Sequence, residues 1–335
     1  MSEFPAGAAP PDVSIVIPVY DGAATIGPLV DDLVARLSDH RLEIVLVNDA
    51  SRDASEAECL GLVARYPQVV VYAALARNFG EHNAAITGLR LATGDLVVTM
   101  DDDLQNPPSE VPRLLAEARR GCDVVYAQFE SKRHHWFRNF GSRFNDVVAN
   151  WLLGKPPGLY LSTFRCLSRF VVDEILQYDG PYPYIDGLIL RSTSRIGAVV
   201  VRHDARPTGE SGYNLRKLVD VWLNMSTSFS ILPLRVVVAV GVLMAIAGGA
   251  FGIEVIVEKI VWPQHAVGWA SLMTALIVFS GIQLIVIGTI GEYVGRLLMT
   301  VNRTPQGVIR RVVRGSDLPR SLGRASSAGE GAGRA

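Results

Sequence analysis

Three consecutive aspartates follow an apolar run in the stretch "VTMDDDLQNPP", residues 98–108. Negative charge at the end of a buried strand is costly unless a positive partner lies against it. A divalent cation is such a partner, since Mg²⁺ or Mn²⁺ takes hard oxygen ligands and keeps room for water and phosphate oxygens. Asp101 and Asp103 can converge on one ion with Gln105 completing the site, whereas alternation turns Asp102 elsewhere. The alternative is a solvated acidic loop.

Strands and helices that can position these aspartates alternate along the first part of the chain. The predicted strands are residues 13–20, 42–49 and 94–101. The helical stretches between them are residues 25–39 and 55–66. Such alternation predicts an α/β fold with a parallel sheet. Ligands of such sheets bind beyond the carboxyl ends of the strands, where Asp21, Asp49 and Asp101 fall.

Two uncharged runs predict a membrane part. Residues 236–253 span roughly 27 Å as a helix, and the second run, residues 268–291, is longer. We therefore expect transmembrane helices over residues 232–257 and 268–292, rather than buried helices of a soluble protein. The hydrophobic share of 49% agrees, while a net charge of -1 argues against a nucleic-acid partner.

Basic residues predict how these helices are oriented. Arg235 precedes the first run and five arginines follow the second, whereas the connecting loop offers only Lys259 beside Glu258. The positive-inside rule then places both termini and the α/β domain on the cytoplasmic side of the inner membrane. Residues 214–231 read as an amphipathic helix in the membrane interface, with Arg216 and Lys217 near lipid phosphates.

The remaining segments complete the predicted organisation. An α/β domain covers residues 12–213 and a basic cytoplasmic segment covers 293–314, while residues 1–11 and 315–335 are expected to be disordered. The three cysteines and the histidines, His82 among them, show no metal-binding spacing and are interpreted as structural.

Four motifs together resemble the polyprenyl-phosphate glycosyltransferases. They are "VSIVIPVYDG", "LVNDASRDAS", "ARNFGEHNAAITGLRLATGDLVVTMDDDLQNPP" and "GESGYN", and the resemblance extends over about residues 12–314. It implies a GT-A nucleotide-sugar-binding, Rossmann-like domain, a divalent metal and a homo-oligomer, a tetramer by family resemblance. It also implies inverting transfer of one sugar from a nucleotide diphosphate, UDP being preferred, to a polyprenyl phosphate such as undecaprenyl or decaprenyl phosphate.

The resemblance also implies roles for residues on the donor side. Matches to the base and ribose pocket and to the donor loop are Pro18, Tyr20, Asp49, Arg77, Asn78 and Gly80. Asp102 is added to this donor set, while Asp101, Asp103 and Gln105 match the metal and diphosphate site. The family usually has a Glu soon after its "PVYN" stretch. This chain has no Glu there, so either Asp21 alone contacts the nucleotide base or the contact to the base differs.

The acceptor side is predicted from a basic segment, "SKRHHWFRNFGSRF". As a helix, it would place Trp136, Phe140 and Phe144 on one face. Arg138 and Ser142 would share another, which suits a membrane edge. Arginine side chains bind phosphate oxygens through charged, often bidentate hydrogen bonds. Positions similar to the family's acceptor-phosphate residues are Arg133, Arg138, Ser142 and Arg206, with Ser211 added from the "GES" motif. A solvated basic face is the alternative.

Asp186 is a further catalytic candidate beside Asp101, Asp103, Arg138 and Arg206. Many relatives carry an Asp where this chain has Leu159, and "PYPYIDG" places Asp186 where other inverting GT-A enzymes carry an acidic base. Sugar recognition, proton removal and a simple capped turn all stay open for it. A base is not required, because a phosphate monoester with a second pKa near 6 is largely ionised at neutral pH.

Three other functions are weighed. A processive polysaccharide synthase carries a Gln-x-x-Arg-Trp motif, which is absent here, and usually more membrane helices. A non-catalytic nucleotide-sugar-binding scaffold would lack the metal ligands that Asp101 and Asp103 supply. A dinucleotide-dependent oxidoreductase would carry G-x-G-x-x-G after its first strand, and this chain does not.

Overall fold

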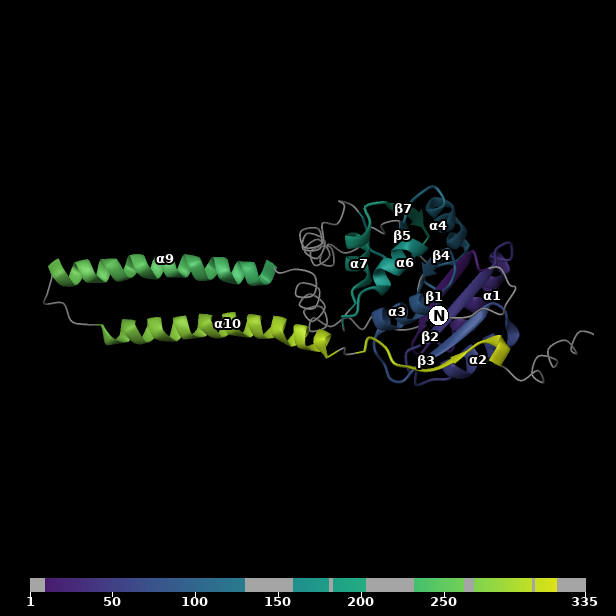
Figure 1. Ribbon diagram of the computed structural model, residues 1–335, viewed down its shortest axis with the longest axis horizontal. Coiled ribbons are helices and arrows are strands. Elements are labelled where there is room, and N and C mark those ends of the chain that lie inside the picture. The colour runs from purple at the N-terminus through teal and green to yellow at the C-terminus, as the bar shows by residue number, and fades with distance from the viewer. Residues whose placement is uncertain are drawn as a thin grey trace, which may run out of the picture. The chain divides into compact units, whose positions relative to one another are not determined.

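The computed structural model describes residues 10–129, 159–180, 183–202, 232–261, 268–302 and 305–317. Contacts divide the chain into two units, one of Met1–Gly212 with Thr304–Ala335 and one of Tyr213–Arg303. The described part of the first unit is an α/β domain, and that of the second is a pair of long helices (Figure 1). The predicted amphipathic helix and disordered termini lie outside the described residues, except for short flanks of the termini.

The α/β domain is built on one sheet with strand order β7-β5-β6-β4-β1-β2-β3-β8. The strands are β1 (Val13–Val19), β2 (Leu42–Asn48), β3 (Val70–Leu75), β4 (Leu96–Thr99), β5 (Val124–Phe129), β6 (Arg165–Ser168), β7 (Ile196–Val201) and β8 (Ile309–Val313). The helices are α1 (Ile26–Arg36), α2 (Ser55–Arg65), α3 (Glu81–Leu91), α4 (Val111–Ala118), α6 (Arg169–Leu176) and α7 (Ile185–Ser192), with short 3₁₀ turns at Pro108–Glu110 and Gly315–Asp317.

The three predicted strands and the two predicted helices are confirmed, with ends shifted by a few residues. The expectation of a parallel sheet is only partly right. β1 runs parallel to β2 and β4, and β2 to β3, but β6 is antiparallel to β4 and β5, and β8 is antiparallel to β3. The antiparallel strands were missed because β6 has four residues and β8 lies in the predicted basic segment.

Helices cover both faces of the sheet. The first face packs against α1, α2 and α4, whose buried side chains join those of β1 and β2 in one apolar cluster. The second face packs against α3, which lies on β1 and β2 and contacts α6. This second contact is close, because a Cβ at Gly88 of α3 would lie 2.3 Å from Val16 Cγ1 of β1. Glycine at this position therefore lets the helix approach the strand.

A crevice opens where β1 and β4 separate. Their pairing ends at Val16 opposite Thr99, after which Met100 N still donates to Val16 O at 3.2 Å. Two residues further along β1 stands Pro18, which has no N–H to donate. Since alternate residues of a strand face the same neighbour, Pro18 faces the space that β4 has left, and no ladder bond is lost. The two strand ends are thus free to line a site.

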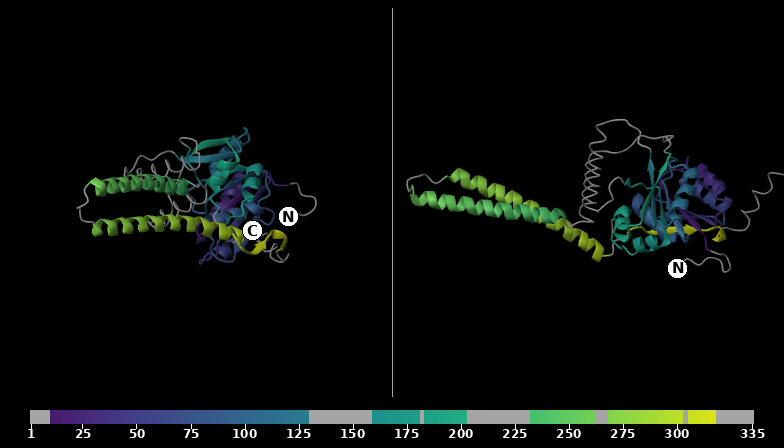
Figure 2. Two further views of the ribbon diagram at one scale, coloured as in Figure 1. Left: turned by 60° about the vertical axis from the view of Figure 1, so that its left-hand side comes forward. Right: turned by 90° about the horizontal axis from the view of Figure 1, so that it is seen from above.

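The chain returns to the sheet after its second long helix. β8 pairs with β3 at the sheet edge, and Figure 2 shows this last strand in yellow on the α/β domain. Arg311 of β8 bonds Glu56 of α2 at 2.6 Å. Just before β8, the buried side chain of Gln306 donates to Tyr178 O and Gly180 O, both at 2.7 Å, and accepts from Arg90 at 2.7 Å. The segment after the second helix is therefore part of the α/β domain.

The second unit contains α9 (Leu232–Val261) and α10 (Trp269–Val301), which lie side by side. The two helices carry apolar stretches, Val237–Glu254 with mean hydropathy 2.0 and Val278–Val301 with mean hydropathy 1.5. Their described leucine, isoleucine and valine side chains are largely exposed. Both helices are long and apolar enough to be candidate membrane spans, as the sequence predicts.

We expect Gly88→Ala to destabilise the domain by about 1–3 kcal/mol, because the new methyl group must displace Val16 in a packed layer. The matched variant is Gly61→Ala on the exposed side of α2, where a Cβ meets nothing within 4 Å. Alanine should be neutral or stabilising there, since it is the better helix former. Thermal unfolding of the purified protein in detergent measures both, and equal Tm values for the two variants would contradict the packing argument.

Candidate active site

The predicted donor-side residues gather at the carboxyl edge of the sheet. Asp21, Asp49 and Asp101 follow the ends of β1, β2 and β4 respectively. Three non-glycine residues there adopt left-handed backbone conformations, and they are Asp21 (φ 53°), Ala50 (φ 57°) and Leu104 (φ 61°). No other non-glycine residue in the described ranges has positive φ. Such strain concentrates at functional sites, so this edge is the candidate site.

Asp49 organises the predicted donor loop. Its buried carboxylate accepts the Phe79 N–H at 2.7 Å and the Gly80 N–H at 2.8 Å, one on each oxygen. Burial raises the pKa of Asp49, although both N–H donors oppose that rise. Gly80, with φ 90°, then starts α3, while Arg77 and Asn78 stay exposed. The loop is thus pinned to the end of β2 with its polar side chains available to a ligand.

The loop after β1 is held by the segment that follows β2. Asp21 Oδ1 accepts the Arg52 N–H at 2.7 Å, and the Asp21 N–H donates to Ser51 at 3.1 Å. Asp21 therefore helps to close the loop. Tyr20 is 42% exposed, so its ring faces outward from the strand end.

The DDD turn places its three carboxylates in different surroundings. Asp101 accepts a hydrogen bond from Thr163 at 2.7 Å, Asp102 accepts the Tyr20 N–H at 3.3 Å, and Asp103 accepts the Gln105 N–H at 3.1 Å. Asp102 lies so close to the β1 loop that a Cβ at Gly22 would be 2.2 Å from its Oδ2. Asp102 thus joins the two strand ends.

Negative charge accumulates in this turn. Burial, reinforced by the charge of Glu81, raises the pKa of Asp101 to about 6. Burial likewise raises the pKa of Asp102 to about 7, with Asp101 and Asp103 adding to the rise and the Tyr20 N–H opposing it. A nearby cation would reverse these shifts.

The donor set fits a divalent cation. Carboxylate and amide oxygens are hard ligands, and Asp101, Asp103 and Gln105 supply them at one turn. Among the described residues, no three Asp, Glu, His or Cys side chains are grouped to hold a metal ion by themselves. An ion at this turn would therefore share its coordination with oxygens from a substrate or water.

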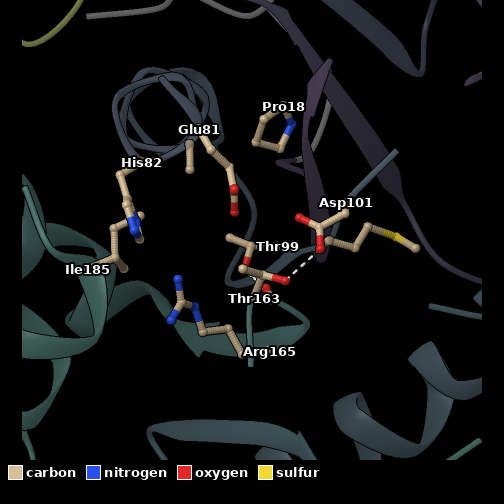
Figure 3. Close-up of a pocket in the computed structure, with 10 residues that line it drawn as sticks. Pro18, Glu81, His82, Thr99, Asp101, Thr163, Arg165 and Ile185 are labelled. Carbon is tan, nitrogen blue, oxygen red and sulfur yellow. Dashed lines mark hydrogen bonds between the residues drawn. The ribbon is translucent and has the colours of Figure 1, made fainter. Parts of the chain in front are cut away.

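A pocket extends from Asp101 toward β6 and α7 (Figure 3). Its lining side chains are Pro18, Glu81, His82, Ala85, Thr99, Met100, Asp101, Thr163, Arg165 and Ile185. At one wall, Arg165 forms an ion pair with Asp186, and Tyr126 donates to the same Asp186 oxygen at 2.8 Å. Burial raises the pKa of Tyr126 well above its usual range, so its phenol stays a donor.

Asp186 lies behind the pocket wall. It is buried in the first turn of α7, and its Oδ1 is occupied by both Arg165 and Tyr126. This position supports a role in orienting Arg165 more directly than proton removal from a substrate.

Five polar pocket residues were assigned no role in the site from the sequence: Glu81, His82, Thr99, Thr163 and Arg165. His82 packs edge-on against Tyr184 with ring centroids 5.8 Å apart, and burial lowers the pKa of its imidazole, so the ring is neutral near pH 7. A signal was present for two of them, since Glu81 and His82 directly follow the donor loop in "RNFGEHNAA". Thr163 and Arg165 are more than 60 residues beyond Asp101 and carry no local signal.

The predicted acceptor-phosphate residues lie outside the described residues. They are Arg133, Arg138, Ser142, Arg206 and Ser211. Their roles stay predictions.

Asp102→Asn should raise Tm in metal-free buffer, and the gain should grow with pH. The folded-state pKa of Asp102 is about 7 against an ordinary 3.8, so the unfolded state ionises first and the wild type loses stability as pH rises through this interval. Asparagine removes that loss and still accepts the Tyr20 N–H, which gives a gain of about 5 °C at pH 8 and much less at pH 5. A gain independent of pH, or equal in Asp95→Asn at the opposite end of β4, would contradict this assignment.

Two family models match the chain. Residues 14–175 match glycosyl transferase family 2, and residues 232–297 match the GtrB C-terminal hairpin. The first match covers the crevice between β1 and β4, and the second covers most of α9 and α10. The motif resemblance stated from the sequence is thereby confirmed.

Relatives match the chain almost from end to end. The undecaprenyl-phosphate 4-deoxy-4-formamido-L-arabinose transferase of Enterobacter sp. (strain 638) is 36% identical over 310 residues, covering 91% of this chain and 94% of the relative. The protein of the same name from Sodalis glossinidius is 34% identical over 305 residues, covering 90% and 94%.

Among solved structures, glucosyl-3-phosphoglycerate synthase from Mycobacterium tuberculosis in complex with UDP aligns with TM-score 0.47 and 18% identity, covering 64% of this chain and 79% of that one. This similarity is too low to bear on the site. The two relatives that match almost the whole chain are sufficient to assign the family. The chain belongs to glycosyl transferase family 2, and its relatives are undecaprenyl-phosphate sugar transferases.

Proposed function

We propose that this protein transfers one sugar from a nucleotide diphosphate sugar, with UDP as the preferred nucleotide, to a polyprenyl phosphate at the cytoplasmic face of the membrane. The observation that carries the proposal is the match to undecaprenyl-phosphate transferases over both the α/β domain and the helical hairpin. The product would be a polyprenyl-phosphate-linked sugar, available as a glycosyl donor for the cell envelope.

The geometry of the crevice supports binding of the nucleotide over β1 and β2. Pro18 and exposed Tyr20 lie at the end of β1, and Asp49 holds the backbone of the donor loop at the end of β2. Arg77 and Asn78 extend from that loop and are exposed. An exposed aromatic ring and exposed polar side chains together suit a base and a ribose.

The diphosphate is assigned to the end of β4. Asp101 and Asp103 would hold a divalent cation there, Mg²⁺ or Mn²⁺, with Gln105 as a further ligand. When bound, such an ion offsets the charge that develops on a departing diphosphate. The raised pKa values of Asp101 and Asp102 support this assignment, because burial and the neighbouring acidic groups disfavour their charged forms and a cation would favour them.

The reaction itself requires few groups. An oxygen of the lipid phosphate attacks the anomeric carbon from the face opposite the nucleotide, and the bond from that carbon to the diphosphate oxygen breaks with its electron pair. No proton has to be removed, because the phosphate monoester is largely ionised at neutral pH. The acceptor phosphate is assigned to Arg133, Arg138, Ser142, Arg206 and Ser211, which would hold it near the second anion.

The membrane arrangement is part of the proposal. α9 and α10 would cross the bilayer with both ends in the cytoplasm, because arginines flank the pair on that side and the connecting loop carries little charge. This orientation keeps the catalytic domain beside the nucleotide donors of the cytoplasm. A homo-oligomer, a tetramer by family resemblance, belongs to the same proposal.

Asp103→Ala should lower lipid-dependent release of UDP by about 100-fold or more, since it removes a ligand for the charge-balancing ion. The assay uses full-length protein in nanodiscs with undecaprenyl phosphate, Mg²⁺ or Mn²⁺, and a panel of UDP- and GDP-sugars. Asp95→Ala is the matched control, because Asp95 is exposed at the amino end of β4. Absence of lipid-dependent release from every donor by the wild type would overturn the proposed function.

The proposed topology predicts opposite labelling of two introduced cysteines. Gln264→Cys, in the loop between the helices, should react with a membrane-impermeant maleimide in intact spheroplasts. Arg310→Cys on β8 should react only after the membrane is permeabilised. Cys59 and Cys166 are buried, and the partly exposed Cys122 is replaced by serine in both variants to remove background labelling. Labelling of Arg310→Cys from outside would refute a cytoplasmic domain.

A further inference from the structure

Arg165 is held in an unusual way for a wall of a polar pocket. Its side chain is only 2% exposed, and its charge is matched by Asp186. Its guanidinium also lies 5.8 Å from the centroid of the Tyr126 ring. Yet its Nε, although buried, finds no hydrogen-bond partner in the described part of the chain. A buried donor without a partner is costly, which suggests that a ligand satisfies it.

Figure 3 shows where the Arg165 side chain lies. The guanidinium of Arg165 rises from β6 into the space below His82, and Glu81 enters the same space from the start of α3. Thr163 and Asp101 form the wall toward β4, joined by their hydrogen bond of 2.7 Å. Donors and acceptors therefore converge on one volume from three separate elements.

The order of the strands indicates which part of a nucleotide diphosphate sugar would occupy this pocket. Across the sheet, β2 and β1 carry the assigned nucleotide residues, β4 carries the assigned diphosphate residues, and β6 with Arg165 comes next. In a nucleotide diphosphate sugar the parts follow in the same order, and the sugar is the part beyond the diphosphate. The pocket thus lies where the sugar must be if the nucleotide lies over β1 and β2.

The charges of the pocket walls limit which sugars can bind. Arg165 is neutralised by Asp186, whereas Glu81 makes no ion pair with any of the described residues. The pocket walls consequently carry more negative than positive charge. A sugar that bears a carboxylate would be repelled by Glu81 and Asp101, whereas hydroxyl or amide groups can donate to them.

We propose that Arg165, Glu81 and His82 form the subsite for the transferred sugar and select an uncharged sugar over a uronic acid, with Asp186 as the positioning residue for Arg165. This inference rests on the proposed function, since it takes a nucleotide diphosphate sugar as the donor. It assigns Arg165 Nε to an oxygen of the sugar and Glu81 to a hydroxyl group.

The test is a comparison of binding with and without the sugar. Dissociation constants of the full-length protein, with Mn²⁺, are measured for UDP, UDP-glucose, UDP-galactose, UDP-N-acetylglucosamine and UDP-glucuronic acid. Arg165→Lys and His82→Asn should weaken the best-bound uncharged UDP-sugar by about tenfold, the effect of one lost hydrogen bond, and change UDP by less than about twofold. Glu81→Gln should improve UDP-glucuronic acid relative to the uncharged donors by about tenfold.

The positioning role of Asp186 has its own readout. Asp186→Asn keeps the size of the side chain and removes its charge, so it should weaken UDP-sugar binding as Arg165→Lys does. The double variant should be no weaker than either single variant, because both changes disable one guanidinium. Asp49→Asn is the contrasting variant, since it disturbs the donor loop and should weaken UDP and UDP-sugars alike.

Equal weakening of UDP and UDP-sugars by the pocket variants, or no weakening of either, would overturn the subsite. So would wild-type protein that binds UDP but none of the uncharged UDP-sugars. Tm values distinguish a variant that misfolds from one that folds but binds weakly. His82→Asn and Glu81→Gln test the subsite without changing the buried ion pair of Arg165 and Asp186. A wild type that binds UDP-sugars selectively, yet releases no UDP with lipid, would contradict the proposed transfer reaction and leave the subsite intact.

Discussion

The separation of β1 from β4 is the constraint on which the site depends. β1 lies between β2 and β4, so the chain proceeds to one side for β2 and β3 and returns to the other side for β4. Connections then leave the strand ends in opposite directions and open a crevice at the carboxyl edge. Pro18 marks the point where β4 no longer pairs with β1, and every strained non-glycine backbone in the described residues follows β1, β2 or β4.

Electrostatics explains why this crevice is suited to a charged donor. Asp101 and Asp102 lie close together and half-buried, and their raised pKa values show that the folded protein opposes their full ionisation. A site that is unfavourable when empty gains the most from a cation and from the ligand that the cation brings. The adjoining pocket differs, because the charges of Arg165 and Asp186 balance each other. Its hydrogen-bonding groups would then distinguish one sugar from another.

The C-terminal segment links the two halves of the chain along the sequence. β8 completes the sheet beside β3, and Gln306 bonds the backbone at Tyr178 and Gly180, a short distance in sequence before α7 and Asp186. Gln306, which precedes β8, therefore supports the segment between α6 and α7.

Local sequence determined the elements and the donor edge of this protein. Periods of two and 3.6 residues predict strands and amphipathic helices, and long apolar runs predict α9 and α10. A run of acidic residues after an apolar strand indicates a cation site. The sequence therefore predicted β1, β2, β4, α9, α10 and the role proposed for Asp101. Tertiary structure alone decided that β6 and β8 run antiparallel, that Thr163 meets Asp101, and that Arg165 pairs with Asp186. The physical reason is that periodicity reports only which face of an element is buried. Pairings between residues 21 or 62 positions apart depend on which faces pack together, and no local pattern encodes that choice.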